Sequence, residues 1–551
     1  MKQDGNSTLS AISYLIEMKK YSIIHLFGII GLIFIISPII YLLLQVFNLS
    51  GWALKSELLI DYSKNTLLMV VIVGGITAIL GVSLAWIVTF YDFPFRRFFK
   101  VLLALPLAIP PYIAAHSYAD FMYSGGLLNK TLLFFGVNKY FDIMNFSGAV
   151  FVYIVTLYPY VYLMCLSFYK NSSASLIDNA RVLNAGSLKL FFKVGLPMAR
   201  LPIVAGTTLA IMELVSDFGV VDYYGVQVFS TGIYKTWLNY SDFNGAIKLS
   251  SILLVIILSI VLLESGLRRR LRYFTSSKTG IARRIKTKTS NKLIIYFLLT
   301  FVLFIGFIIP VVQLFYNSYY VYEKILNAKL MKIIFTTFYY SALSSIICVI
   351  ISFSIANLTK THNNKFTTFI SKLATMGYSI PGVIVGLSVI FTFIDVDKIL
   401  VPIYRIIGIE SKVLVLSTSV FILVFAYIVR FLAVSYNNIY SGYKKINPNL
   451  FKASHTLGKN DFKTFLKVDI PLMLPTLLTA FLLVFLEIIK ELPITLMLKP
   501  YNIETLTGRV YMYVHNEQYA EASVPSLIII FLGIIIVSLV MLYREEKNVE
   551  S

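Results

Sequence analysis

Four carboxylates occupy matching positions near the ends of two apolar windows. Glu213 and Asp217 correspond to Glu487 and Glu491 at one offset (487 − 213 = 274), and Lys490 stands beside the last. A charge close to a membrane helix is costly, and its usual explanation is a substrate or ion path. Carboxylate oxygen is a hard ligand that suits a hard cation. We expect these five residues to line a translocation path and regard Glu213 and Glu487 as candidate metal contacts. The alternative is that the charges reach water at the helix end or are neutralised by Lys490.

The rest of the sequence has no recognisable catalytic spacing. Its histidines are scattered, without an HExxH motif, at His25, His116, His362, His455 and His515. Cys165 and Cys348 lie inside apolar windows and have neither metal-ligand nor disulfide spacing. The GxxxxGK[ST] phosphate loop is missing from the sequence. We therefore expect no catalytic residue and no cofactor bound by this chain, which disfavours a membrane-embedded enzyme.

The composition is that of a membrane protein that crosses the bilayer many times. Of its 551 residues, 58% are hydrophobic and only 14% are charged, with a mean hydropathy of +0.79. Windows of about 20 apolar residues can span a bilayer core. Twelve such windows occur at 21–46, 65–90, 98–118, 145–168, 201–221, 246–264, 293–317, 333–357, 367–393, 411–434, 474–493 and 524–543. We predict an all-α membrane protein with about twelve transmembrane helices.

The net charge of +21 follows the expected membrane topology. Lysine and arginine concentrate in alternate connecting segments, whereas the segments between them mix acids and bases. Positive residues favour the cytoplasmic side, so both termini are expected in the cytoplasm of a multi-pass protein of the cytoplasmic (inner) membrane. Segment 265–292 is too polar to span and is predicted to be a basic cytoplasmic linker. Topology explains the charge without a nucleic-acid partner.

The chain contains the same pattern twice. Residues 66–86 register on residues 337–357 (337 − 66 = 271), and Ile109-Pro110 falls on Ile380-Pro381. Such duplication is common in transporters, where paired repeats surround a shared path. We predict two homologous halves of six spans each, 1–264 and 293–551, joined by the linker.

A short polar segment recurs between the fourth and fifth spans of each half. The segments, 175–197 and 449–471, align without a gap at an offset of 274 (449 − 175). In the second copy, Asn447 suits a helix N-cap and Gly458 suits a helix end. In the first copy, Asn184 stands where Gly458 stands in the second. Helices lying on the membrane surface would also be amphipathic, but the repeated turn and re-entry favour docking into grooves on two copies of a partner.

Both segments resemble the EAA loop of ABC-importer permeases. The second copy matches that pattern at Lys452, Ala453, Ser454, Gly458, Val468, Ile470 and Pro471, and the first at Asp178, Asn179, Ala180, Asn184, Val194, Leu196 and Pro197. Neither copy has the initial Glu. The resemblance implies that these loops, including Leu183 and Leu457, couple the chain to a separate ATP-hydrolysing subunit. It also implies the type I ABC importer permease fold.

The stretches around the carboxylates are similar to those of fused ferric-iron ABC permeases. Residues 213–219, 490–493, 231–234 and 519–522 occupy the places of the family's ETLADFG, KELP, TGIY and YAEA sequences. The resemblance covers about residues 21–543. It implies ferric-iron import by alternating access, an extracytoplasmic iron-binding protein, and two partner ATPase subunits that hold ATP and Mg. Alternatives are a fused thiamine or other small-solute permease, which shares the architecture, and a secondary transporter driven by an ion gradient.

Overall fold

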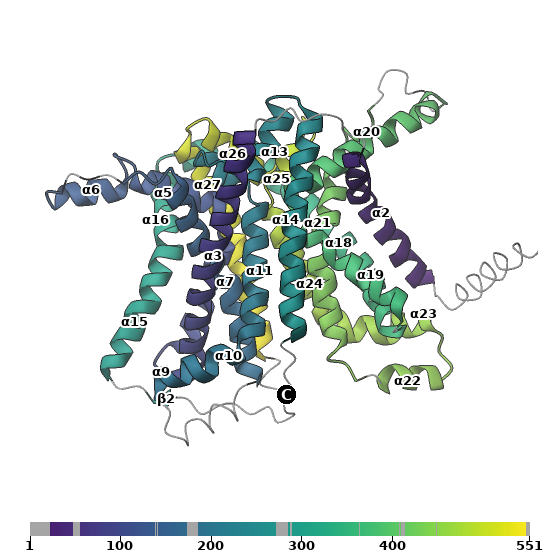
Figure 1. Cartoon of the computed structure of the whole chain (residues 1–551), viewed down its shortest axis with the longest axis horizontal. Coiled ribbons are helices and arrows are strands. Elements are labelled where there is room, and N and C mark those ends of the chain that lie inside the picture. The colour runs from purple at the N-terminus through teal and green to yellow at the C-terminus, as the bar shows by residue number, and fades with distance from the viewer. Residues whose placement is uncertain are drawn as a thin grey trace, which may run out of the picture. The chain divides into compact units, whose positions relative to one another are not determined.

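A computed structural model shows a protein built almost wholly of helices (Figure 1). The structure describes residues 23–47, 56–137, 139, 141–172, 186–270, 285–286, 289–362, 364–406, 408, 414–447 and 449–546. Within these residues, nine helices are long and apolar enough to cross a membrane, or up to eleven when each of two bent helix pairs is one span.

The first repeat and the linker contain the following elements, in chain order: α2 (Ile23–Phe47), α3 (Ser56–Phe90), β1 (Tyr91–Asp92), α4 (Arg96–Leu102), the 3₁₀ turn η1 (Leu105–Ala108), α5 (Pro111–Met122), α6 (Leu127–Phe134), α7 (Phe146–Ser172), α9 (Ser187–Leu190), the π-helical turn η2 (Phe191–Gly195), α10 (Leu196–Met198), α11 (Arg200–Ser216), α12 (Gly219–Tyr223), α13 (Phe229–Leu238), α14 (Phe243–Arg270) and β2 (Ile285–Lys286).

The second repeat contains α15 (Thr289–Leu303), the π-helical turn η3 (Phe304–Ile308), α16 (Ile309–Tyr319), α17 (Tyr322–Ile325), α18 (Ala328–Thr361), α19 (Lys365–Met376), the 3₁₀ turn η4 (Gly377–Ser379), α20 (Gly382–Ile406), α21 (Val420–Tyr443), α22 (Asn449–Thr456), α23 (Asp461–Thr464), the π-helical turn η5 (Phe465–Asp469), α24 (Ile470–Lys490), α25 (Pro493–Leu498), α26 (Leu506–His515) and α27 (Tyr519–Glu546).

Eleven of the twelve predicted spans coincide with these helices or bent pairs. The exception is 367–393, where the second repeat has α19, a 3₁₀ turn and α20 instead of one apolar span. Helix α20 carries Asp395, Asp397, Lys398 and Arg405, and these charges keep it out of the set of apolar helices. The first repeat breaks at the matching place, where the chain bends by 92° before α5. Pro110 and Pro381 stand at the two breaks, because proline cannot continue a helix.

The helices group into two compact units that do not follow chain order. The smaller unit contains 1–42, 338–378 and 388–488, and the larger contains 43–337, 379–387 and 489–551. The first spanning helix of each repeat thus belongs to the unit formed mainly by the other repeat.

In the larger unit, α3, α7 and α11 lie side by side (Figure 1). Their closest approach is made possible by two glycines that face Val161 of α7. A Cβ at Gly81 would lie 2.6 Å from the Val161 Cβ, and one at Gly206 would lie 2.6 Å from the Val161 Cα. Helices α16 and α27 belong to the same unit and pack on each other, and Ser117 of α5 donates to the Pro310 carbonyl of α16 at 2.9 Å. The linker residues 285–286 pair in parallel with 91–92, beyond the end of α3.

In the smaller unit, α2 packs on α18 of the second repeat. Gly28 allows the approach, since a Cβ there would lie 3.1 Å from the Ser354 Cβ. Phe34 of α2 meets Phe425 of α21 with ring centroids 4.9 Å apart. Helix α19 packs on α21, where a Cβ at Gly377 would lie 2.4 Å from the Val429 carbonyl oxygen.

The Gly81 contact yields a stability prediction. Gly81→Ala places a methyl group against the Val161 side chain and the Tyr162 backbone nitrogen, so it should lower the free energy of unfolding by about 1–3 kcal/mol. Thermal unfolding of the purified protein in detergent measures the change. Gly75→Ala is the matched control, because it lies in the same helix with no atom within 4 Å of the new Cβ. An equal effect of the two substitutions would refute the packing argument.

Candidate functional site

The second copy of the repeated segment forms the predicted helix and turn. The Asn447 Oδ1 accepts from the Asn449 N–H at 3.0 Å, and α22 follows. Gly458 has a φ of +75°, the Gly458 N–H donates to the His455 carbonyl, and the Lys459 N–H donates to the Ser454 carbonyl. This pair of bonds is the Schellman arrangement that ends a helix at a left-handed glycine. The predicted cap at Asn447 and helix end at Gly458 are confirmed.

Helix α22 has an inner face and an exposed apolar face. Phe451 and Ser454 are buried, and the Ser454 hydroxyl lies 2.9 Å from the Thr464 hydroxyl of α23. On the other face, Leu450 is 49% exposed and Leu457 is 78% exposed. Lys452 and Ala453 are exposed beside them, and Pro471 lies in the first turn of α24. An exposed apolar face on a capped helix suits docking into a groove of a partner.

The first copy is described only in part. Asp178, Asn179, Ala180, Leu183 and Asn184 lie outside the described residues. The described part runs from Gly186 through α9, η2 and α10, which contains Pro197, into α11. Both copies have a π-helical turn immediately before re-entry, η2 and η5, at an offset of 274 (465 − 191). Such turns are rare and often mark functional positions.

A buried ion pair lies where the second copy re-enters the bundle. The Asp469 carboxylate accepts from Lys360 Nζ of α18 at 3.0 Å and from the Asn357 amide at 2.5 Å. Asn357 also bonds to the His25 ring of α2 at 2.9 Å and to the Tyr443 hydroxyl of α21 at 3.3 Å. The side chains of Lys360 and Asp469 are 18% and 2% exposed. The residues therefore tie the re-entry point to three helices of the smaller unit.

Lys360 also contacts the repeated segment itself. Its Nζ lies 2.9 Å from the centroid of the Phe451 ring of α22 and 4.9 Å from that of Tyr443. Attraction of an ammonium group to an aromatic face strengthens when the pair is removed from water. Lys360 therefore connects α22 to α18 and, through Asp469, to the start of α24.

The first repeat fills the same place with aromatic side chains. Trp86 corresponds to Asn357 (357 − 86 = 271), and Gly195 corresponds to Asp469 (469 − 195 = 274). A Cβ at Gly195 would lie 2.4 Å from the Trp86 ring, so the glycine makes room for the indole. Phe90 and Tyr169 pack on that ring with centroids 4.3 and 5.4 Å away. The two repeats thus share the same arrangement of helices, but different side chains pack at this position: aromatic in the first repeat, polar and charged in the second.

Each of the two downstream carboxylates of the predicted path caps a broken helix. Asp217 ends α11, and its Oδ2 accepts from the Tyr153 hydroxyl at 2.8 Å and from the Val220 N–H at 2.9 Å. Glu491 follows α24 and is 5% exposed, and its Oε1 accepts from the Ile494 N–H at 3.1 Å. Broken helices with such ends form ion and substrate sites in many transporters.

The other predicted path residues lie close by in the sequence but in different units. Glu213 is half-buried on α11 of the larger unit, and Glu487 is half-buried on the part of α24 in the smaller unit. Lys490 Nζ donates to the Leu107 carbonyl of η1 at 3.5 Å. Among the described residues, no three His, Cys, Asp or Glu side chains gather so that they could hold a metal ion. The path and metal assignments of these residues stay predictions.

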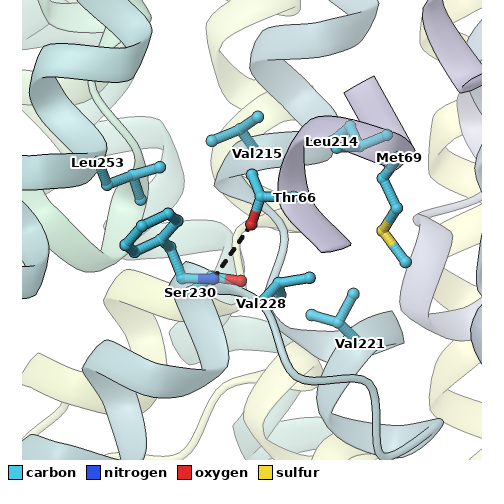
Figure 2. Close-up of a pocket in the computed structure, with 9 residues that line it drawn as sticks. Thr66, Met69, Leu214, Val215, Val221, Val228, Ser230 and Leu253 are labelled. Carbon is cyan, nitrogen blue, oxygen red and sulfur yellow. Dashed lines mark hydrogen bonds between the residues drawn. The ribbon is translucent and has the colours of Figure 1, made fainter. Parts of the chain in front are cut away.

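Two cavities among the described residues have apolar linings. One of about 10 Å³ lies between α3, α11 and the chain from α12 to α13. Figure 2 shows its lining, including Thr66 of α3, whose hydroxyl accepts from the Phe229 N–H at 3.3 Å. Ser230 lines the same cavity and donates to the Asp217 carbonyl at 2.9 Å. In the smaller unit, α2, α18 and α21 border an apolar groove of about 360 Å³. No charged side chain lines either space, so neither suits an ion.

Asp222, five residues after Asp217, takes part in a hydrogen bond between the two repeats. The Tyr511 hydroxyl of α26 donates to the Asp222 carboxylate at 2.9 Å. Burial raises the pKa of Asp222, against the lowering effect of that hydrogen bond and of Lys235. Burial and then the Asp222 charge raise the pKa of Tyr234 to about 12. Tyr234 therefore stays neutral at physiological pH, and Asp222 holds its proton more readily than an ordinary aspartate.

Four residues of these networks were not expected from the sequence: Lys360, Asp469, Asn357 and Tyr153. A signal was available for the last, because Tyr427 stands opposite Tyr153 at the same offset of 274 (427 − 153). Lys360 and Asp469 break the repeat, and only the fold brings them together.

The buried pair yields a prediction on stability. Lys360→Met leaves the Asp469 carboxylate without its cation and should lower the free energy of unfolding by about 3–5 kcal/mol. The double variant Lys360→Met/Asp469→Asn should recover part of that loss, because no buried charge is left unpaired. Thermal unfolding of the four proteins of this cycle measures both effects.

The exposed pair Lys398–Asp395, 2.8 Å apart, is the matched control. Its side chains are 63% and 41% exposed, so Lys398→Met should cost about 1 kcal/mol at most. Equal losses from Lys360→Met and Lys398→Met would contradict the burial argument.

This chain is similar in sequence to known transport permeases. The chain is 24% identical over 516 residues to the Fe(3+)-transport system permease protein FbpB 2 of Haemophilus influenzae, covering 90% of this chain and 94% of that protein. It is 28% identical over 257 residues to the molybdate/tungstate transport system permease protein WtpB of Methanocaldococcus jannaschii, covering 46% of this chain and 99% of that protein. It is 25% identical over 210 residues to the sulfate transport system permease protein CysW of Escherichia coli K12, covering 37% of this chain and 71% of that protein.

A family model for the binding-protein-dependent transport system inner membrane component matches residues 75–273 and again residues 349–547. These matches contain the repeated segments, the carboxylates and both broken helices. The chain is a multi-pass membrane protein that belongs to this family of transport permeases and carries its domain twice.

Proposed function

We propose that this chain is the permease of an ABC importer for ferric iron. The observation that most supports ferric iron as the substrate is the match along 90% of the chain to a relative named as an Fe(3+)-transport permease. The buried or half-buried carboxylates support it, because they suit a hard cation. The half-buried Asp217 and the buried Glu491 argue against the oxyanions named for the two shorter relatives, since a carboxylate removed from water repels an anion.

The energy for transport comes from partner subunits. Two ATPase subunits bind ATP and Mg, and each receives one repeated segment of this chain, 175–197 or 449–471. An extracytoplasmic binding protein delivers the ferric ion to the opposite side. Closure of the ATPases shifts the permease between inward and outward states by their differential affinity for the two. In this proposal the repeated segments and both termini lie in the cytoplasm.

The contacts of α22 suggest how the movement passes into the bundle. Its apolar residues Leu450 and Leu457 are exposed for docking, whereas Phe451 on its inner face contacts Lys360. Lys360 in turn holds Asp469 at the start of α24, the helix that leads to Glu487 and Glu491. A displacement of α22 therefore moves α18 and α24 together.

Uptake of radiolabelled ferric iron tests the substrate. Cells that lack this chain should lose ATP-dependent uptake at limiting iron, and the restored chain should recover it. Uptake should survive an uncoupler that leaves ATP intact and stop when ATP is depleted. Survival under ATP depletion with loss under the uncoupler would indicate a secondary transporter. Unchanged iron uptake in the deleted cells would reject the substrate, and thiamine would be the next label.

The left-handed glycine yields a second test. Gly458→Pro cannot adopt a φ of +75°, so α22 cannot end in its turn and transport should be abolished while the protein stays in the membrane. Gly136→Pro is the matched control, because Gly136 has a φ of +77° in the connection between α6 and α7. Uptake and membrane abundance are measured for both. Normal ATP-dependent uptake by Gly458→Pro would refute the coupling role of this segment.

A further inference from the structure

The Tyr112 hydroxyl is a buried polar group without a partner among the described residues. The side chain lies on the first turn of α5 and is 6% exposed, and its oxygen makes no hydrogen bond there. Other buried tyrosines of the larger unit are paired, as Tyr158 is with the Leu103 carbonyl at 2.9 Å and Tyr153 with Asp217 at 2.8 Å. A buried hydroxyl without a partner is costly and calls for an explanation such as a bound water or ion.

The surroundings of Tyr112 bring two carboxylates toward it. A Cβ at Gly219 would lie 2.5 Å from the Tyr112 Cβ and 2.8 Å from the Leu492 Cδ2, so all three residues meet. Asp217 is two residues before Gly219, and Glu491 is the residue before Leu492. Each carboxylate thus lies within two residues of an atom that packs beside Tyr112. All five residues belong to the larger unit.

The backbone at this place is held by the same carboxylates. Asp217 caps α12 through the Val220 N–H, and Glu491 caps α25 through the Ile494 N–H. Tyr153 fixes the orientation of Asp217 from α7. A broken helix from each repeat thus contributes one carboxylate to the neighbourhood of the Tyr112 side chain.

We propose that Tyr112, Asp217 and Glu491 form a buried binding step for the transported trivalent cation, with the Tyr112 hydroxyl as its third oxygen ligand. The proposal rests on the ferric function above and names the site within it. Carboxylate and phenol oxygens are hard ligands, which suit a small cation of high charge.

A structural role for Tyr112 predicts the opposite behaviour. If the hydroxyl only fills space, its removal relieves a buried unpaired group and changes no ion contact. Tyr112→Phe should then raise or preserve thermal stability and leave transport untouched. The aromatic ring and its packing against Gly219 stay in place in this variant.

The experiment uses the complete importer in proteoliposomes, with its ATPase and binding protein, and measures uptake of radiolabelled ferric iron. Tyr112→Phe should lower uptake at limiting iron by about tenfold or more without lowering the unfolding temperature. Glu491→Gln, which keeps the size of the side chain, should lower uptake in the same way. Tyr158→Phe is the matched control: it removes a paired hydroxyl in the same unit, so it should lower the unfolding temperature and keep uptake.

The outcomes separate the two proposals. Iron uptake by the unaltered importer together with unchanged uptake by Tyr112→Phe would overturn the binding step and leave the ferric function standing. A loss of uptake that accompanies a drop in unfolding temperature as large as that of Tyr158→Phe would also overturn it, because the effect would be structural. Absence of iron uptake by the unaltered importer would overturn both proposals.

Discussion

Polar groups inside a membrane-spanning bundle, the backbone N–H and C=O groups above all, need hydrogen-bond partners within the protein, because lipid offers none. This constraint explains the helices, and it explains what happens where they break. At the end of α11 and of α24, the next N–H groups would be unsatisfied, and the carboxylates of Asp217 and Glu491 accept from them. The same constraint pairs Asp469 with Lys360 and Asn357. Charges in this bundle are therefore part of its architecture as well as of its chemistry.

The two repeats have equivalent helices, but the side chains packed between these helices differ. Trp86 over Gly195 and Asn357 beside Asp469 solve the same packing problem, one with an indole over a glycine and the other with an amide and a carboxylate. Each solution needs both members, since a Cβ at Gly195 would collide with the indole and an Asp469 without Lys360 would be a buried lone charge. The aromatic version is insensitive to charge, whereas the polar version depends on a cation that also touches Phe451 of α22. The re-entry points of the two repeated segments are thus held by different interactions.

Sequence alone predicted the features that depend on local chemistry. The apolar windows, the cap at Asn447 and the left-handed turn at Gly458 follow from hydropathy and backbone preference, and the structure confirms them. The break between α19 and α20 was missed because residues 367–393 are apolar on average, although charges follow immediately at Asp395 and Asp397. The partners of the carboxylates were not predictable, because Tyr153 and Asp217 lie 64 residues apart and Lys360 and Asp469 lie 109 apart. Their contact depends on helix packing, which a periodic pattern does not specify.

The exchange of first helices between repeats has a structural consequence. Helix α2 begins the first repeat, yet Gly28 packs on Ser354 and His25 bonds to Asn357 in the second. Asn357 is also a partner of Asp469, so α2 contacts the network that Lys360 extends to α22. This network therefore connects α22 to α2 through Phe451, Lys360, Asp469, Asn357 and His25. The hydrogen bond between His25 and Asn357 and the packing of Gly28 on Ser354 thus join a helix of the first repeat to the second repeat.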